Sequence, residues 1–243
     1  MREYTAENQK MSPSMYMVRK GIAAGFPIVL GYLPVAITYG VLAKQAGMSL
    51  VELTLMSALV FAGAAQFMAV NMIAVGTGIL EIIAATFVLN FRHFVMSFSF
   101  INRLRGLDLK WKAPLSLGLT DESFAVTALH TKEAKMEKGA LFYTAIILTA
   151  YLSWVLGSML GGLLGEVIPE KLSQSMGVAL YALFIGLLVP SVKKEFRVGL
   201  IAITAMLINF ICVQLGMSAG WAIVAATVFG GMSGIFLIKE EAE

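Results

Sequence analysis

The sequence predicts an all-α membrane protein, a polytopic helix bundle, and its composition carries that prediction. Of its 243 residues, 58% are hydrophobic and 14% are charged, whereas soluble domains carry about 25% charged residues. The mean hydropathy is +0.82. Most of the surface must therefore face an apolar medium, and the length suits roughly six to eight membrane spans of about 20 residues each.

Eight apolar segments follow one another along the chain, joined by short polar connections. They cover about residues 21–43, 50–75, 79–100, 114–130, 139–164, 174–190, 198–215 and 220–238. No connection has the composition of a linker between soluble domains. We therefore expect a single transmembrane domain over 21–238, between an N-terminal tail (1–20) and a short C-terminus (239–243).

Lysine and arginine residues indicate which loops face the cytoplasm. The basic connections are the N-terminal tail, residues 103–112, residues 132–138 and residues 193–197, and such loops are cytoplasmic under the positive-inside rule. Eight full crossings would place residues 103–112 outside, because three segments precede them. We therefore predict about six full spans plus two interrupted, re-entrant segments, 50–75 and 114–130, with both termini cytoplasmic. Seven or eight full spans are the alternative.

Both proposed re-entrant segments contain residues that favour irregular backbone. Segment 50–75 is interrupted at Gly63, and segment 114–130 carries the adjacent acids Asp121 and Glu122. Inserting one acidic residue at the centre of a lipid-facing helix costs about 2.5–3.5 kcal/mol. With two adjacent acidic residues, we expect segment 114–130 to face protein or water and not lipid. Inverted pairs of broken helices are typical of transporters, and we expect the breaks to frame a site at the membrane midplane.

A proline-containing stretch lies inside the first segment. Pro27 precedes Gly31-Tyr32-Leu33-Pro34, and each proline removes a backbone donor and clashes with the preceding turn. We therefore expect the helix to break or kink at Pro34. A packing kink that contacts no ligand is the competing interpretation.

Arg92 and its neighbours form the main basic group within an apolar segment. Asn90, Arg92 and His93 lie deep in segment 79–100. The distance from there to the lipid headgroups is long for an arginine side chain, so we expect Arg92 to have a partner or to face water. Asp121 or Glu122 is its natural counter-charge. An unperturbed histidine titrates near neutral pH, so His93, Asp121 and Glu122 are the candidates for carrying a coupling proton. A structural salt bridge and an interfacial arginine are the alternatives.

Six polar side chains are candidates for contacting a substrate: Gln66, Asn71, Asn90, Arg92, Asp121 and Glu122. Arginine and helix N-termini suit an anionic group, and carboxylates suit a cationic one. The amides can equally bridge helices. We expect an aliphatic group to lie among Phe67, Met68 and Phe94, while Tyr151, Trp154 and Tyr181 either line a path or pack.

Signatures of enzymes, metal sites and cofactor sites are missing from the sequence. It contains two histidines in different segments and one cysteine, Cys212, which excludes an intramolecular disulfide and gives no metal-binding cluster. No protease, hydrolase or phosphate-binding motif occurs. We expect no catalysis, cofactor or nucleic-acid partner. A non-coupled channel-like or structural subunit, or an intramembrane enzyme, remains the alternative to a transporter.

Six motifs occur in a fixed order along the chain. They are Arg19-Lys20-Gly21, Gly31-Tyr32-Leu33-Pro34, Phe61-Ala62-Gly63-Ala64-Ala65-Gln66-Phe67, Asn90-Phe91-Arg92-His93, Thr120-Asp121-Glu122 and Ala182-Leu183-Phe184-Ile185-Gly186-Leu187-Leu188-Val189-Pro190. Each motif is weak alone, but the ordered set is specific. It covers roughly residues 19–215 and resembles the AzlC family, also called BrnF or YgaZ.

That resemblance implies a secondary transporter subunit in the cytoplasmic (inner) membrane. Members export valine, leucine, isoleucine and in some cases methionine, driven by the proton motive force. The resemblance also implies a partner, a small AzlD-type membrane subunit. The chain departs from the family pattern at one place. An acidic residue is expected shortly before Ala182, but the residues there, Val178 to Tyr181, include none. Selectivity or coupling will differ here if that position contacts substrate or proton in relatives.

Overall fold

The described part of the protein is helical and contains no strand. The computed structural model describes residues 11–104, 107–165, 167–168 and 178–237. Its helices that are long and apolar enough to cross a bilayer are α1 (Pro13–Gln45), α4 (Ile79–Arg103), α7 (Gly139–Leu164), α10 (Arg197–Gln214) and α11 (Ala219–Leu237). A further apolar helix, α9 (Val178–Lys194), is described over 17 residues. The predicted multi-pass membrane bundle is therefore confirmed.

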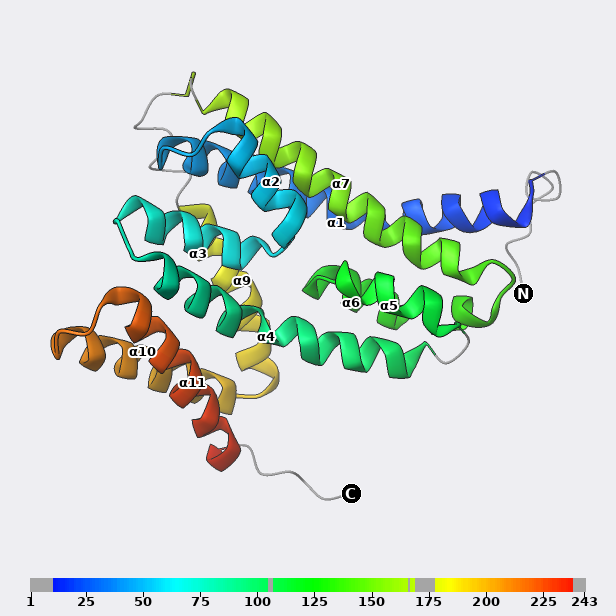
Figure 1. The fold of residues 1–243 in the computed structure, drawn as a ribbon. Helices are drawn as coiled ribbons and strands as arrows, with labels where there is room; N and C mark the ends of the chain where they lie inside the picture. Colours follow the sequence, from blue (N-terminus) through cyan, green and yellow to red (C-terminus); the bar gives the residue numbers. More distant parts are fainter. Residues whose placement is uncertain (1–10, 105–106, 166, 169–177, 238–243) are drawn as a thin grey trace.

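Two of the predicted segments are each divided into a helical hairpin. Residues 50–75 form α2 (Leu50–Val60) and α3 (Gly63–Ala74), and residues 109–130 form α5 (Leu109–Leu117) and α6 (Asp121–Leu129). The two hairpins enter the bundle from opposite ends, and their tips lie near its middle (Figure 1). Helix α4 consequently runs antiparallel to α1, as a re-entrant segment over 50–75 predicts (Figure 1).

Helices α1 and α7 form the central pair and lie side by side over much of their length (Figure 1). Small residues allow this close approach, since a Cβ on Gly40 would collide with the Ser158 carbonyl oxygen and one on Gly161 with the Ile37 carbonyl oxygen. Van der Waals packing of this kind drives helix association in lipid, where the hydrophobic effect between helices is lost. The pair is the scaffold against which the hairpins pack.

Helix α1 continues through both of its prolines, so the break predicted at Pro34 is not a helix end. Neighbouring helices and hydroxyl side chains stabilise proline within membrane helices, and here α7 packs along α1 while Thr38 Oγ1 donates to the Pro34 carbonyl at 3.0 Å. The helix also begins at Pro13, inside the predicted tail of residues 1–20. Residues 1–10 and 239–243 of the predicted termini lie outside the described residues.

The break between α2 and α3 is sharp and local. Phe61 adopts a left-handed backbone conformation with φ 42° and ψ 45°, and α3 starts at Gly63, the predicted helix break. A Cβ on Gly63 would lie 2.6 Å from Trp154 Cη2. Glycine is therefore required here, because the indole of α7 occupies the space of a side chain.

The C-terminal helices stand apart from this body. Helices α10 and α11 pack against each other, and α11 contacts α4 (Figure 1). Helix α10 buries no residue in the described structure, so much of its apolar surface faces the surrounding medium. At one end, Ser218 donates to Glu81 Oε2 at 2.7 Å and connects the start of α11 to α4.

Candidate functional site

The tips of the two hairpins meet α1, α4 and α7 around a cavity of about 180 Å³. Its polar lining residues are Arg92, His93, Thr120, Asp121 and Glu122, and its larger apolar or aromatic ones are Pro27, Ile28, Tyr32, Val35, Phe61 and Trp154. Ligand pockets that hold drug-sized molecules measure about 300–1,000 Å³. A smaller space with an apolar wall and a few convergent polar groups suits a small amphipathic ligand.

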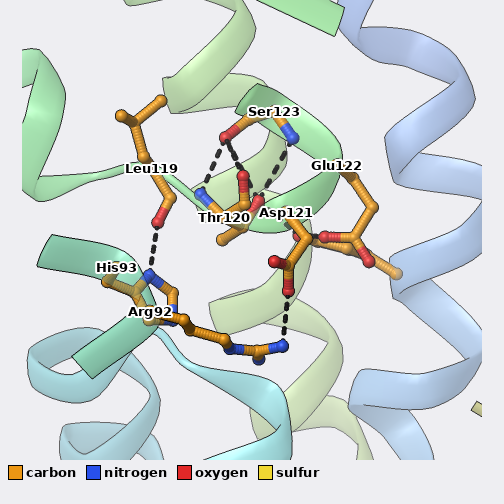
Figure 2. A network of polar contacts seen from close by, with 8 residues as sticks. Arg92, His93, Leu119, Thr120, Asp121, Glu122 and Ser123 are labelled. Carbon is orange, nitrogen blue, oxygen red and sulfur yellow. Dashed lines mark hydrogen bonds and ion pairs between the residues drawn. The ribbon is translucent and has the colours of Figure 1, made fainter. Parts of the chain in front are cut away.

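Arg92 of α4 forms an ion pair with the first residue of α6. Its Nη1 lies 2.9 Å from Asp121 Oδ2, and the two side chains are 35% and 34% exposed (Figure 2). Of the two counter-charges predicted for Arg92, Asp121 forms the ion pair and Glu122 does not. Among the described residues, Arg92 Nε is buried without a hydrogen-bond partner, which leaves this donor available to a ligand.

His93 joins α4 to the residues that precede α6. Its Nδ1 lies 2.9 Å from the Leu119 carbonyl oxygen (Figure 2), so in the neutral ring Nδ1 carries the hydrogen and donates it. Nε2 is then an acceptor, and it is buried with no partner within the described part of the chain. A buried polar atom without a partner calls for water or a ligand, and His93 lines the cavity.

Glu122 has a different environment from its neighbour Asp121. Its Oε2 lies 2.5 Å from the hydroxyl of Tyr32 on α1, and the same hydroxyl lies 2.6 Å from Thr120 Oγ1. Within the described structure no basic side chain forms an ion pair with Glu122, and Arg92 is joined to Asp121 alone (Figure 2). The cavity thus holds one neutralised pair and one carboxylate that is open to a cationic group.

The first turns of α3 and α6 both line the cavity, but only α6 is capped. Ser123 N donates to Thr120 Oγ1 at 3.3 Å and Thr120 N donates to Ser123 Oγ at 2.9 Å (Figure 2). Ala62, at the same position before α3, makes no side-chain cap. The first amides of a helix lack partners within it and carry a partial positive charge. The start of α3 therefore offers donors to an anion.

The three predicted amide candidates lie outside the cavity lining. Gln66 is fully buried and accepts a hydrogen bond from Trp154 Nε1 at 2.8 Å. Asn71 donates to the Phe67 carbonyl oxygen of its own helix at 3.0 Å. Asn90 Oδ1 is buried without a partner among the described residues. Gln66 bridges helices, which is the alternative that the sequence left open.

The apolar wall is also built from other residues than the sequence suggested. Phe67 is 1% exposed and packs in the core, while Phe94 is 57% exposed; neither lines the cavity. Tyr32, Phe61 and Trp154 take their place. Tyr32 was within reach of sequence reasoning, because it is a polar aromatic inside the proline-containing motif of the first span. Tyr151 donates to the Ala58 carbonyl oxygen at 2.9 Å, and the side chain of Tyr181 lies outside the described residues.

Comparisons with known proteins bear on this region directly. Residues 27–168 match the family model described as AzlC protein. The chain is 35% identical over 206 residues to an uncharacterized membrane protein of Archaeoglobus fulgidus, covering 82% of this chain and 89% of that protein. It is 26% identical to the inner membrane protein YgaZ of Escherichia coli, over 92% of each chain.

A third relative carries a functional name. The chain is 30% identical over 132 residues to the branched-chain amino acid transport protein AzlC of Bacillus subtilis, covering 54% of this chain and 51% of that protein. No solved structure gives a significant match. The family match extends from Pro27 to Ile168 and the cavity lining from Pro27 to Trp154, so the match contains the whole site. The chain belongs to the AzlC family.

Proposed function

We propose that this protein is a secondary transporter subunit that exports branched-chain amino acids through the cavity between its two hairpins. The observation that carries the proposal is the cavity itself, where an apolar wall, an unpaired carboxylate and free donors for an anion share one small space. The name of the Bacillus subtilis relative supports the substrate class. Valine, leucine, isoleucine and methionine are the expected cargo.

A zwitterionic amino acid needs two opposite polarities and one apolar surface. Its carboxylate is proposed to lie between the uncapped start of α3 and Arg92 Nε, where amide and guanidinium donors point at an anion. Its ammonium is proposed to lie at Glu122, a carboxylate that forms no ion pair among the described residues. The aliphatic side chain then rests on the wall formed by Ile28, Val35 and Trp154.

The proton motive force is the proposed energy source, with Glu122 as the coupling residue. A proton and a substrate ammonium both bind a carboxylate, and they cannot occupy Glu122 together. Asp121 is engaged by Arg92, which leaves Glu122 and His93 as the coupling candidates. If the empty carrier returns with a proton on Glu122 and the loaded carrier holds the ammonium there, proton entry drives amino acid exit.

The proposed topology places both termini in the cytoplasm and the protein in the inner membrane. Lys20 near the start of α1 pairs at 2.9 Å with Glu133, which follows α6, so the start of α1 and the basic connection at residues 132–138 lie at the same end of the bundle. Under the positive-inside rule this end is cytoplasmic. A small AzlD-type subunit is the proposed partner, and the exposed outer faces of α4 and α10 leave room for it beside lipid.

The test measures intracellular valine, leucine and isoleucine after a dipeptide load, in cells that lack their own exporters. Co-expression with an AzlD-type small membrane protein should lower all three, and expression of this chain alone tests the need for a partner. Glu122→Gln should abolish proton-dependent export. Glu81→Gln is the matched control, because Glu81 is a carboxylate of α4 that does not line the cavity.

Contrary outcomes separate the alternatives. High amino acid levels with both chains in the membrane would contradict the substrate class. Wild-type export by Glu122→Gln would remove that carboxylate from the mechanism. A flux in liposomes that does not saturate with substrate would indicate a channel-like subunit, and turnover of a lipid would indicate an enzyme.

A further inference from the structure

Trp154 lies where the cavity meets the buried core. It lines the cavity, yet the residue is only 4% exposed. The ring of Tyr32 packs edge-on against it with centroids 5.4 Å apart, and that of Tyr39 stacks at 6.4 Å. Behind it, the backbone at Gly63 leaves no space, since a Cβ there would lie 2.6 Å from Trp154 Cη2. The indole is therefore a fixed part of the wall.

A closed ring of hydrogen bonds holds the indole in this position. Trp154 Nε1 donates to Gln66 Oε1 at 2.8 Å, and Gln66 Nε2 donates to Ser57 Oγ at 3.0 Å. Ser57 Oγ donates to Ser158 Oγ at 2.8 Å, and Ser158 Oγ donates back to the Trp154 carbonyl oxygen at 2.7 Å. All four residues are buried, so the loss of one leaves a polar atom without a partner in the core.

Tyr32 connects this wall to the polar side of the cavity. Its ring touches Trp154, and its hydroxyl lies 2.5 Å from Glu122 Oε2. An amino acid whose ammonium lies at Glu122 therefore extends its side chain along Tyr32 toward the indole. A branched aliphatic side chain can pack against this surface, whereas an aromatic one needs space that the indole already fills.

We propose that Trp154 restricts the cargo to amino acids with aliphatic side chains, and that Gln66 is a positioning residue that fixes the indole for this role. The inference rests on the proposed function and deepens it by naming the residue that sets substrate size. Gln66 acts here through Trp154 and does not itself contact the substrate.

The first test compares the export of leucine with that of phenylalanine. Trp154→Phe enlarges the cavity and should lower the leucine-to-phenylalanine ratio about tenfold, the scale on which apolar pockets discriminate. Gln66→Leu releases the indole and should shift the ratio in the same direction by a smaller factor. The ratio is the informative quantity, because a purely structural defect lowers both fluxes together.

A second variant tests the wall without disturbing the ring of hydrogen bonds. Gly31 lines the cavity, and a Cβ added there meets no atom within 4 Å. Gly31→Ala should therefore fold normally and reduce the export of leucine and isoleucine relative to valine. Gly231→Ala in α11 is the matched control, because its Cβ also meets open space but lies outside the cavity lining.

Binding is measured independently of transport through Trp154 itself. The chain has 3 tryptophans, so Trp111→Phe with Trp221→Phe leaves Trp154 as the sole indole. Leucine should change its fluorescence saturably, and glycine much less.

Two results would overturn the inference. Normal leucine export, with a Trp154 emission that leucine does not alter and ratios unchanged in Trp154→Phe and Gly31→Ala, would refute it while leaving the proposed function standing. Absence of any branched-chain export by the wild type, together with an emission insensitive to leucine, would overturn both.

Discussion

The two helix breaks that frame the cavity each lie between two short helices, but their chemistry differs. The break before α3 is neutral, with Phe61 in a left-handed conformation and Ala62 in the cap position without a side-chain bond. The break before α6 is acidic, with Thr120 as its cap and Asp121 and Glu122 in the first turn. One break offers amide donors, and the other offers carboxylates.

This difference supports the proposal that one small cavity binds a zwitterion. A helix N-terminus attracts negative charge, and in α6 the two acidic residues already satisfy that attraction. The first turn of α3 has neither an acidic residue nor a side-chain cap, so its amide groups remain available to an anionic ligand. Arg92 lies between the two breaks, with Nη1 on Asp121 and Nε unpaired within the described structure.

The largest effect is expected from removing the cation that lies between the breaks. Arg92→Gln leaves Asp121 unpaired and removes a donor for the substrate carboxylate. Loss of one partner of a buried charge pair costs about 2–5 kcal/mol. Because Arg92 and Asp121 are partly exposed, we expect the loss of binding free energy to be near the lower limit, about 2 kcal/mol, which is about 30-fold in affinity. Leucine binding in detergent measures it. Arg92→Lys should retain part of the affinity, and wild-type binding by Arg92→Gln would exclude Arg92 from the anion side.

Loss of the α6 cap should have a smaller effect, on stability. Thr120→Ala removes the acceptor of the Ser123 amide and a neighbour of the Tyr32 hydroxyl, and loss of a cap costs about 1 kcal/mol. Thermal unfolding in detergent measures the change. Thr120→Ser retains the hydroxyl and should remain close to wild type. Equal unfolding midpoints for all three proteins would mean that the cap contributes nothing.

Giving α3 the cap that it lacks should make the two breaks more alike. A hydroxyl in Ala62→Ser can accept from an amide that the substrate carboxylate is proposed to use. A lost or replaced hydrogen bond is worth about 0.5–1.5 kcal/mol, so leucine affinity should fall about threefold to tenfold without loss of stability. Ala62→Gly, which adds no acceptor, is the control. Unchanged affinity in Ala62→Ser would place the carboxylate elsewhere.

The smallest effect concerns Glu133, which follows α6 outside the spans. Burial alone would raise the pKa of this carboxyl, but hydrogen bonds from Lys20 and His130 outweigh burial and hold the pKa below its ordinary value of 4.5. Because the folded pKa is the lower one, this stabilisation is complete above the unfolded pKa and is lost as the pH falls through the folded pKa.

Unfolding midpoints as a function of pH test this contribution. The midpoint of the wild type should decline below about pH 4.5, and that of Glu133→Gln should decline less, because the glutamine cannot titrate. Lys20→Met should flatten the profile in the same way. Parallel profiles for all three proteins would show that the contact does not contribute to stability.

Much of the fold followed from local properties of the chain in a bilayer. Apolar segments of spanning length predicted the helices, and the basic residues at 103–112 forced segments 50–75 and 114–130 to be re-entrant. Helix α3 starts at Gly63. Pro34 did not end α1, which continues through it and packs along α7.

The candidate site was predictable where charge was involved and unpredictable where amides were. Arg92, His93, Asp121 and Glu122 all line the cavity, since buried charges in a membrane require partners or water. An amide in an apolar segment bonds whichever group reaches it, and for Gln66 that group is Trp154, 88 residues further along the chain. No local pattern contains that pairing.

The sequence by itself determined the class of protein, the positions of its apolar segments and the charged residues that line the cavity, because these follow from the transfer of each segment into lipid. Only the tertiary structure decided which partner each of those charged side chains has. Successive residues of a helix point about 100° apart, so Asp121 meets Arg92 while Glu122 meets Tyr32. That pairing depends on how α6 is rotated against α1 and α4, which is a property of the packed bundle and not of any single segment.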